Sequence, residues 1–156
     1  MERILGIDPG SRATGYGLVE SDRGVLRFVA CGVIKTTVNM PFNYRLNQIF
    51  AGVNEVIQLH GPTEAAVEEV FLATNPGSAL KLGQARGAAV VAVMQNNLEV
   101  ADYSAKQIKQ AVAGYGQAGK KQIQHMVRVL LGLDGSPSSM KIRPRGSTGP
   151  ISLKPP

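Results

Sequence analysis

The chain has 156 residues, of which 44% are hydrophobic, and it carries a formal net charge of +6. This length and composition suit one globular domain with its own core. Since no long apolar run and no basic-then-apolar leader occurs, we expect neither a membrane span nor a secretory signal. The one cysteine, Cys31, cannot form an internal disulfide, so we expect a cytoplasmic protein.

The beginning of the chain predicts three strands in an antiparallel meander. Residues 4–8 are an apolar strand that ends in Asp8, and a Pro-Gly turn follows at once. Residues 14–20 and 25–34 read as the second and third strands, with a turn at 21–24 between them.

Helices and strands alternate in the next part of the chain. Apolar residues recur at spacings of three and four over 43–60, which predicts an amphipathic helix that ends at Gly61-Pro62. Residues 65–70 form a fourth strand, 78–96 a second helix and 99–103 a fifth strand. The second helix is rich in Gly and Ala, which permits close packing on the sheet or, alternatively, a dimer seam. This order favours a mixed α/β sheet with helices on its faces.

Two further helices are expected at 104–113 and 120–131, and this region is basic. Residues 104–133 contain no carboxylate but hold the cations Lys106, Lys109, Lys120, Lys121 and Arg128. A basic face on an otherwise balanced body is typical of a protein that binds a nucleic-acid backbone. A solvated helix surface is the other interpretation, and it stays open. The Gly-rich segment 114–121 fits most of a GxxxxGK phosphate loop but lacks the Ser/Thr, so we interpret it as a linker between helices.

Two carboxylates each follow a short apolar run in a predicted strand. Asp8 ends the first strand, and Glu68 lies in the fourth. If the two strands are neighbours, both acids converge on one point, which is how proteins build an oxygen-ligand site for a hard divalent cation. Since side chains alternate along a strand, only one residue of the pair Glu68-Glu69 can join Asp8.

Three segments of the chain together resemble one known family. They are ILGIDPGSRATGYG, AVEEVFLATNPGSALKLGQARGAAV and QIKQAVAGYGQAGKKQIQHMVRVLLGL. They are similar to the RuvC family of Holliday junction resolvases, bacterial members of the RNase H-like superfamily, over roughly residues 3–133. The resemblance implies a mixed five-stranded sheet in the order βββαβαβα, with helices on both faces. It also implies a homodimeric, Mg²⁺-dependent endonuclease with two ions per active site. Such an enzyme resolves four-way DNA junctions by paired nicks during recombination and repair, and acts with a branch-migration motor of RuvA and RuvB type.

The resemblance assigns roles to particular residues. Asp8 and Glu68 correspond to the first two catalytic, metal-binding carboxylates, and Phe71 to an aromatic that stacks on an unpaired base near the junction centre. Lys109 and Lys120 match basic residues beside the active site, and Lys121 joins them as a DNA-binding candidate. The helix at 78–96 matches the family's dimer seam. The sugar-kinase and actin superfamily is an alternative source of the first motif, but it requires a second domain that 156 residues do not supply.

The chain departs from the family pattern after residue 133. Family members continue into a helix that opens with two aspartates three residues apart, the remaining metal ligands. Here residues 134–156 are basic and Pro-rich, no Asp, Glu or His follows Asp134, and we expect a disordered tail after a resolvase domain at 1–133. We therefore expect impaired catalysis, with Asp134 as the candidate substitute ligand. The alternative function is a non-catalytic protein that binds four-way junctions, the product of a truncated or frame-shifted resolvase.

Overall fold

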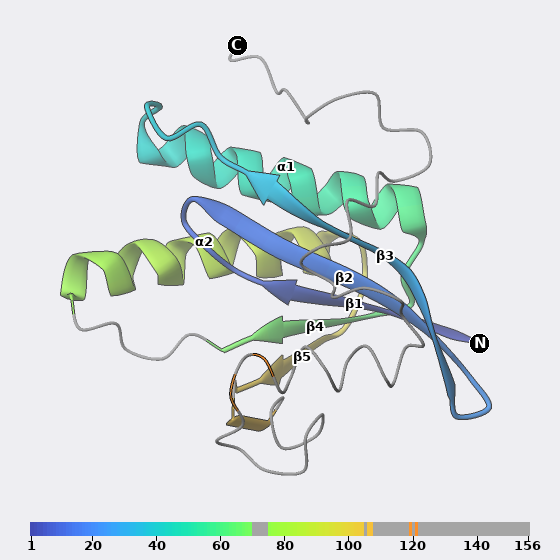
Figure 1. The fold of residues 1–156 in the computed structure, drawn as a ribbon. Coiled ribbons are helices and arrows are strands. Elements are labelled where there is room, and N and C mark those ends of the chain that lie inside the picture. Colours follow the sequence, from blue (N-terminus) through green and yellow to red (C-terminus); the bar gives the residue numbers. More distant parts are fainter. Residues whose placement is uncertain (70–74, 105, 108–118, 120, 122–156) are drawn as a thin grey trace.

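A computed structural model describes residues 1–69, 75–104, 106–107, 119 and 121. Its elements follow in the order that the sequence predicts (Figure 1): β1 Glu2–Asp8, β2 Ala13–Asp22, β3 Val25–Lys35, α1 Phe42–His60, β4 Glu64–Glu68, α2 Pro76–Gln95 and β5 Val100–Tyr103. The expected helices at 104–113 and 120–131 lie almost entirely outside the described residues, and the expected tail at 134–156 lies wholly outside them.

The five strands form one mixed sheet in the order β3-β2-β1-β4-β5. The first three are an antiparallel meander, as predicted, whereas β4 pairs parallel to β1 and β5 pairs parallel to β4. The connections from β1 to β4 and from β4 to β5 contain helices, as parallel pairing requires. The predicted five-stranded mixed sheet is therefore confirmed.

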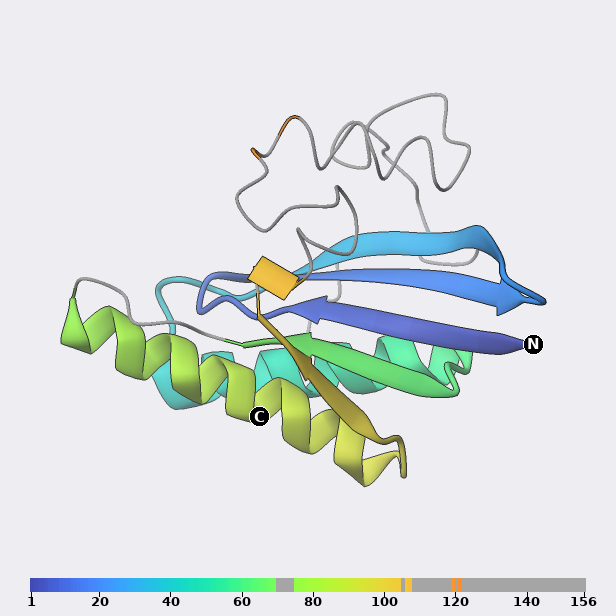
Figure 2. The same ribbon diagram turned by 90° about the horizontal axis from the view of Figure 1, so that it is seen from below.

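Helices α1 and α2 lie side by side on the same face of the sheet (Figure 2). They cover the core side chains of the strands, among which Leu5, Leu18 and Val67 are fully buried. The expectation of helices on both faces thus holds for one face among the described residues, and the helices expected for the other face fall outside them. Within the described part of the chain, no helix is long and apolar enough to cross a membrane.

Local sequence signals account for the helix ends. Helix α1 ends at Gly61, which adopts a left-handed conformation (φ +55°) and donates its N–H to the Ile57 carbonyl at 2.8 Å. Helix α2 begins two residues before the predicted start, because Asn75 caps it and Pro76 occupies its first turn. The Asn75 Oδ1 accepts the N–H groups of Gly77 and Ser78 at 2.9 and 3.4 Å.

Small residues let the helix layer approach the sheet closely. Ala85, Ala89 and Ala92 of α2 are completely buried, which confirms the close packing expected from the composition of this helix. In α1, a Cβ placed on Gly52 would lie 2.5 Å from the Ile34 Cγ2 atom of β3. The distance from this helix to β3 is therefore set by the absence of a side chain at residue 52.

Candidate active site

The strand pairing brings Asp8 and Glu68 to one edge of the sheet. Strands β1 and β4 run parallel, and Ile7 pairs with Val67, so the next residue of each strand is one of the two acids. Neighbouring strands lie about 4.8 Å apart, which is a separation that one cation can bridge with two carboxylates. The sequence-based expectation that these two strands are neighbours is confirmed.

The two acids also belong to the same face of the sheet. Ile7 and Val67 are buried on the face that α1 and α2 cover, so alternation sends Asp8 and Glu68 to the opposite face and Glu69 back toward the helices. Asp8 is exposed, and Glu68 is half-buried. The Glu69 N–H donates to the Tyr103 carbonyl at 2.9 Å, which continues the pairing of β4 with β5 past Glu68. The geometry therefore favours Glu68 over Glu69 as the partner of Asp8.

The turn after Asp8 is compact. A Cβ at Gly10 would collide with the Ala13 carbonyl oxygen, so the close approach across this turn requires glycine. The Gly10 N–H donates to the Thr14 hydroxyl at 3.4 Å, and this hydroxyl lies 3.2 Å from the Gly10 carbonyl, to which it donates in turn. Since Thr14 is completely buried, these bonds fix the turn from within.

An arginine of α2 holds the backbone at Glu68. The Arg86 Nε donates to the Glu68 carbonyl at 3.3 Å, and the Arg86 guanidinium forms an ion pair with Asp102 of β5. One side chain thus links the carboxyl end of β4 to both β5 and α2. Sequence reasoning missed Arg86, because its partners lie 18 and 16 residues away and no local pattern announces them.

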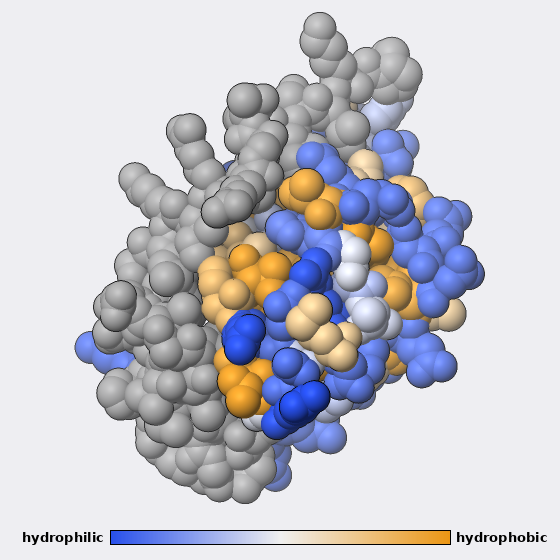
Figure 3. Space-filling model, turned by 90° about the vertical axis from the view of Figure 1, so that its right-hand side faces the viewer, coloured by the Kyte–Doolittle hydropathy of each residue, from blue (hydrophilic) through white to orange (hydrophobic). Residues whose placement is uncertain are grey.

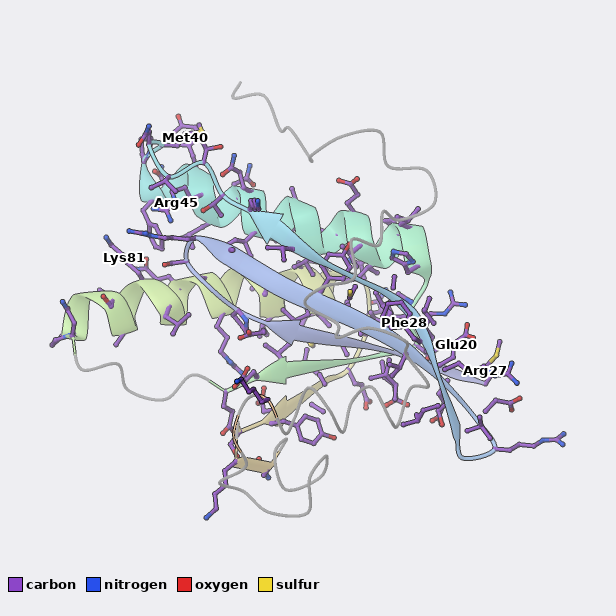
Figure 4. All side chains as sticks on the ribbon, viewed as in Figure 1. Glu20, Arg27, Phe28, Met40, Arg45 and Lys81 are labelled. Carbon is purple, nitrogen blue, oxygen red and sulfur yellow. The ribbon has the colours of Figure 1, made fainter. Side chains whose placement is uncertain are left out.

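Three exposed cations, Arg12, Lys35 and Lys81, belong to the elements that meet at the carboxyl ends of β1 and β4. Lys35 ends β3 and pairs with Ala13, the residue that follows Arg12. Figure 4 places Lys81 and the buried Arg45 at the end of the molecule toward which β1 and β4 run. The opposite end, seen in Figure 3, carries hydrophilic side chains interspersed with small apolar patches. Sequence reasoning had considered Arg12 as a phosphate contact near the turn but had not selected Lys35 or Lys81 for DNA binding.

Most of the other predicted site residues belong to parts of the chain that the structure does not describe. Phe71, Lys109, Lys120 and Asp134 lie outside the described residues, whereas Lys121 is described and exposed. Within the described ranges, no group of three or more His, Cys, Asp or Glu side chains gathers around one point. The carboxylate oxygens of Asp8 and Glu68 are hard ligands that suit a divalent cation. These two residues supply two carboxylates to such a site.

Comparison with known proteins identifies the family. The family model described as "Crossover junction endodeoxyribonuclease RuvC" matches residues 4–143. The chain belongs to the RuvC family. A curated RuvC from Acinetobacter baumannii is 59% identical over 140 residues, which is 89% of this chain and 76% of that protein. This family is one of crossover junction endodeoxyribonucleases, which are hydrolases.

Solved structures agree with this assignment. The chain of T. thermophilus RuvC in complex with a Holliday junction substrate is 37% identical and superposes with a TM-score of 0.82, covering 88% of this chain and 84% of that one. The yeast mitochondrial Holliday junction resolvase Ydc2 is 11% identical, with a TM-score of 0.61 over 83% of this chain and 64% of that one, and therefore shares the fold. The RNase H-like architecture expected from the sequence is confirmed.

Proposed function

We propose that this chain resolves Holliday junctions by paired, Mg²⁺-dependent nicks during DNA recombination and repair. The observation that supports it best is the parallel pairing of β1 with β4, which delivers Asp8 and Glu68 to the same edge and face of the sheet. The 37% identical T. thermophilus RuvC, whose structure includes a Holliday junction substrate, supports this choice of DNA.

In this proposal Asp8 and Glu68 hold the metal. Bound Mg²⁺ supplies Lewis acidity toward a phosphate oxygen and activates the attacking water. The compact turn at 9–14 keeps Asp8 at the sheet edge, and Arg86 keeps the backbone of Glu68 in register with β5. Lys109, Lys120 and Lys121 bind the DNA backbone and stabilise the negative charge that develops during cleavage. Phe71 stacks on an unpaired base at the junction centre.

A second function is favoured by the small number of acids. Among the described residues only Asp8 and Glu68 meet at this edge, whereas a site for two metal ions generally needs further carboxylates. Asp134 is our candidate for a further ligand. Without one, the chain binds four-way junctions through its basic surface and does not cut them.

We further propose that the chain acts as a homodimer through the outer face of α2. Residues spaced by three and four along this helix point away from the core and are apolar or small: Leu80, Gly83, Gly87, Val91 and Met94. Of these residues, Gly87 and Val91 line a groove of about 550 Å³ together with residues of α1, and a Cβ on Gly83 or Gly87 would meet nothing within 4 Å. A second copy could therefore approach this helix closely. A motor of RuvA and RuvB type is the proposed partner, and the cytoplasm, where the DNA is, the proposed compartment.

The experiment that tests the activity compares the unaltered chain with D8N and D22N on a synthetic four-way junction. Asp22 is an exposed aspartate at the far end of β2, so D22N is the matched control. We expect Mg²⁺-dependent nicks from the unaltered chain and D22N, none from D8N, and equal or tighter binding by D8N in gel shifts. Nicks that survive D8N would refute the assignment of the metal site. Salt-dependent binding without any nicks would favour the non-catalytic alternative.

A further inference from the structure

A buried arginine of α1 lies under the loop that follows Asp8. Arg45 is only 9% exposed, and its Nη2 donates to the Ser11 carbonyl at 2.5 Å. Its Nε donates to the Thr36 hydroxyl at 3.2 Å. That hydroxyl lies 3.1 Å from the carbonyl groups of both Ser11 and Arg12, to which it donates, and the Thr36 N–H donates to the Arg12 carbonyl at 3.0 Å. Two consecutive carbonyl groups of the loop are thus held from below.

The arginine itself is fixed in position. Its guanidinium carbon lies 5.4 Å from the centroid of the Phe42 ring, and the Lys81 Nζ lies 5.9 Å from the same centroid. Among the described residues, the hydrogen bonds of Arg45 go to a hydroxyl and a carbonyl, and it forms no ion pair with a carboxylate. A cation is costly to bury, so a buried arginine bound to neutral acceptors indicates that its position serves a purpose that a hydrophobic residue could not serve.

The loop lies between Asp8 and Thr14, whose own bonds to Gly10 hold its other half. Within residues 9–14, which follow the carboxylate, three backbone carbonyl groups are thus bonded to buried side chains. The Gly10 carbonyl is bonded to the Thr14 hydroxyl, and the carbonyls of Ser11 and Arg12 are bonded to the Thr36 hydroxyl. Because Arg12 is exposed while its carbonyl is held inward, the loop presents its cationic side chain to solvent next to the end of β1.

We propose that Arg45 is a positioning residue for DNA cleavage: with Thr36 it fixes the loop after Asp8, and thereby the direction in which this carboxylate leaves the sheet. The inference rests on the proposed function, since it concerns the same site. A displacement of about 1 Å at a reacting group can cost a factor of about 100 in rate, so a rigid support beneath Asp8 matters more to the chemical step than to DNA affinity.

The test compares R45Q with R3Q. Arg3 is the matched control because it also donates to a backbone carbonyl, that of His60, and to one side chain, Glu20, but it does so on β1 far from Asp8. We expect the single-turnover nicking rate of R45Q on a four-way junction to fall about 10- to 100-fold, with the junction Kd changed less than about threefold. R3Q keeps both values within about twofold. R45K, which retains the charge and can bond one of the two acceptors, gives a rate between these.

Hydrogen exchange provides a readout without DNA. We expect the Thr36 and Gly10 amides to exchange at least about tenfold faster in R45Q than in R3Q, because their bonding partners are released. T36V, which preserves the shape but removes the hydroxyl, should act in the same direction and serves if R45Q does not fold. Equal amide exchange rates in R45Q and R3Q would overturn the proposal. So would a loss of junction binding in R45Q as large as its loss of nicking rate, since a partly unfolded chain would lose both.

The two proposals can fail separately. If the unaltered chain binds junctions but does not nick them, the proposed activity fails, and positioning is judged from the exchange rates and from a calorimetric titration with Mn²⁺ alone. Weaker Mn²⁺ binding by R45Q than by R3Q, together with faster loop exchange, would then support the role of Arg45. Unchanged Mn²⁺ binding would refute it.

Discussion

Glu68 and Glu69 are adjacent acids with opposite orientations. Substituting each with Gln tests which of the two is the metal ligand. Glu68 shares a face with Asp8, whereas Glu69 follows the last residue of β4 and donates its N–H to Tyr103. We expect E68Q to reduce the nicking rate by at least about 1000-fold, as loss of a metal ligand does, and E69Q to change it by less than about threefold. Single-turnover nicking with equal junction binding checks this. A large loss of nicking rate in E69Q alone would show that Glu69, and not Glu68, is the metal ligand.

His60 makes the stability of the fold depend on pH. Burial, and then the positive charge of Arg3, lower the pKa of His60 in the folded chain from its ordinary value of 6.5. The unfolded chain therefore binds a proton at His60 at a higher pH than the folded chain does. As the pH falls from 6.5 to the folded pKa, this difference lowers the free energy of unfolding. Below the folded pKa, His60 causes no further loss of stability. The Tm of the unaltered chain should fall more between about pH 7.5 and 5.5 than the Tm of H60Q. His125 is present in both chains and cancels in the difference.

At the scale of single residues, sequence patterns located the acids but not their supports. Asp8 and Glu68 could be found because each follows a short apolar run. Strand alternation showed only that one of Glu68 and Glu69 can join Asp8, and the family resemblance selected Glu68. Arg45 and Arg86 could not be found, because each acts on backbone atoms 34 and 18 residues away, at distances that only the folded chain makes short. In the sequence, Arg45 is simply a polar residue of an amphipathic helix, and Arg86 is a polar residue in a helix rich in Gly and Ala.

Between elements, the packing of α1 on β3 depends on Gly52. A Cβ on this residue would lie 2.5 Å from the Ile34 Cγ2, so we expect G52A to destabilise the fold by about 1–3 kcal/mol. I34A alone leaves a cavity and costs about 2–5 kcal/mol. In the I34A background the added methyl group enters that cavity, and G52A should become neutral or stabilising. Denaturant unfolding of the four chains of this cycle measures the coupling, and additive effects would show that the two residues do not meet.

The sequence was most informative about the order and the boundaries of the helices and strands. The order of strands and helices from β1 to β5 follows from the changes between alternating and helical periodicity, and most boundaries are correct within two residues. The start of α2 differs by two residues, since the cap at Asn75 and the proline at Pro76 precede the first apolar residue of the pattern. The pairing of β1 with β4 could not be predicted from the periodicity, because periodicity carries no information on which strands are neighbours. The sequence therefore supported the convergence of the two acids only on the assumption that these strands pair.

For the whole molecule, α2 differs from α1 in having two apolar faces. One face packs inward through its alanines, and the other exposes Leu80, Val91 and Met94 on both sides of two glycines. Monomeric proteins rarely expose such a continuous apolar stripe. Since a junction has two strands to cut, a second copy seated on this stripe would bring a second Asp8 and Glu68 to the same DNA.

V91E tests this arrangement, and V25E is its matched control. Val91 is 52% exposed on the outer face of α2, and Val25 is 56% exposed at the start of β3, so both changes place a charge on a solvent-accessible valine. If α2 forms the seam, burying the new carboxylate of V91E is costly, and we expect V91E to elute as a monomer while V25E remains dimeric. On a supercoiled plasmid with a cruciform, two nicks within one binding event yield a linear product. We therefore expect V91E to accumulate nicked circles instead, and a linear product from V91E at the unaltered rate would refute the seam.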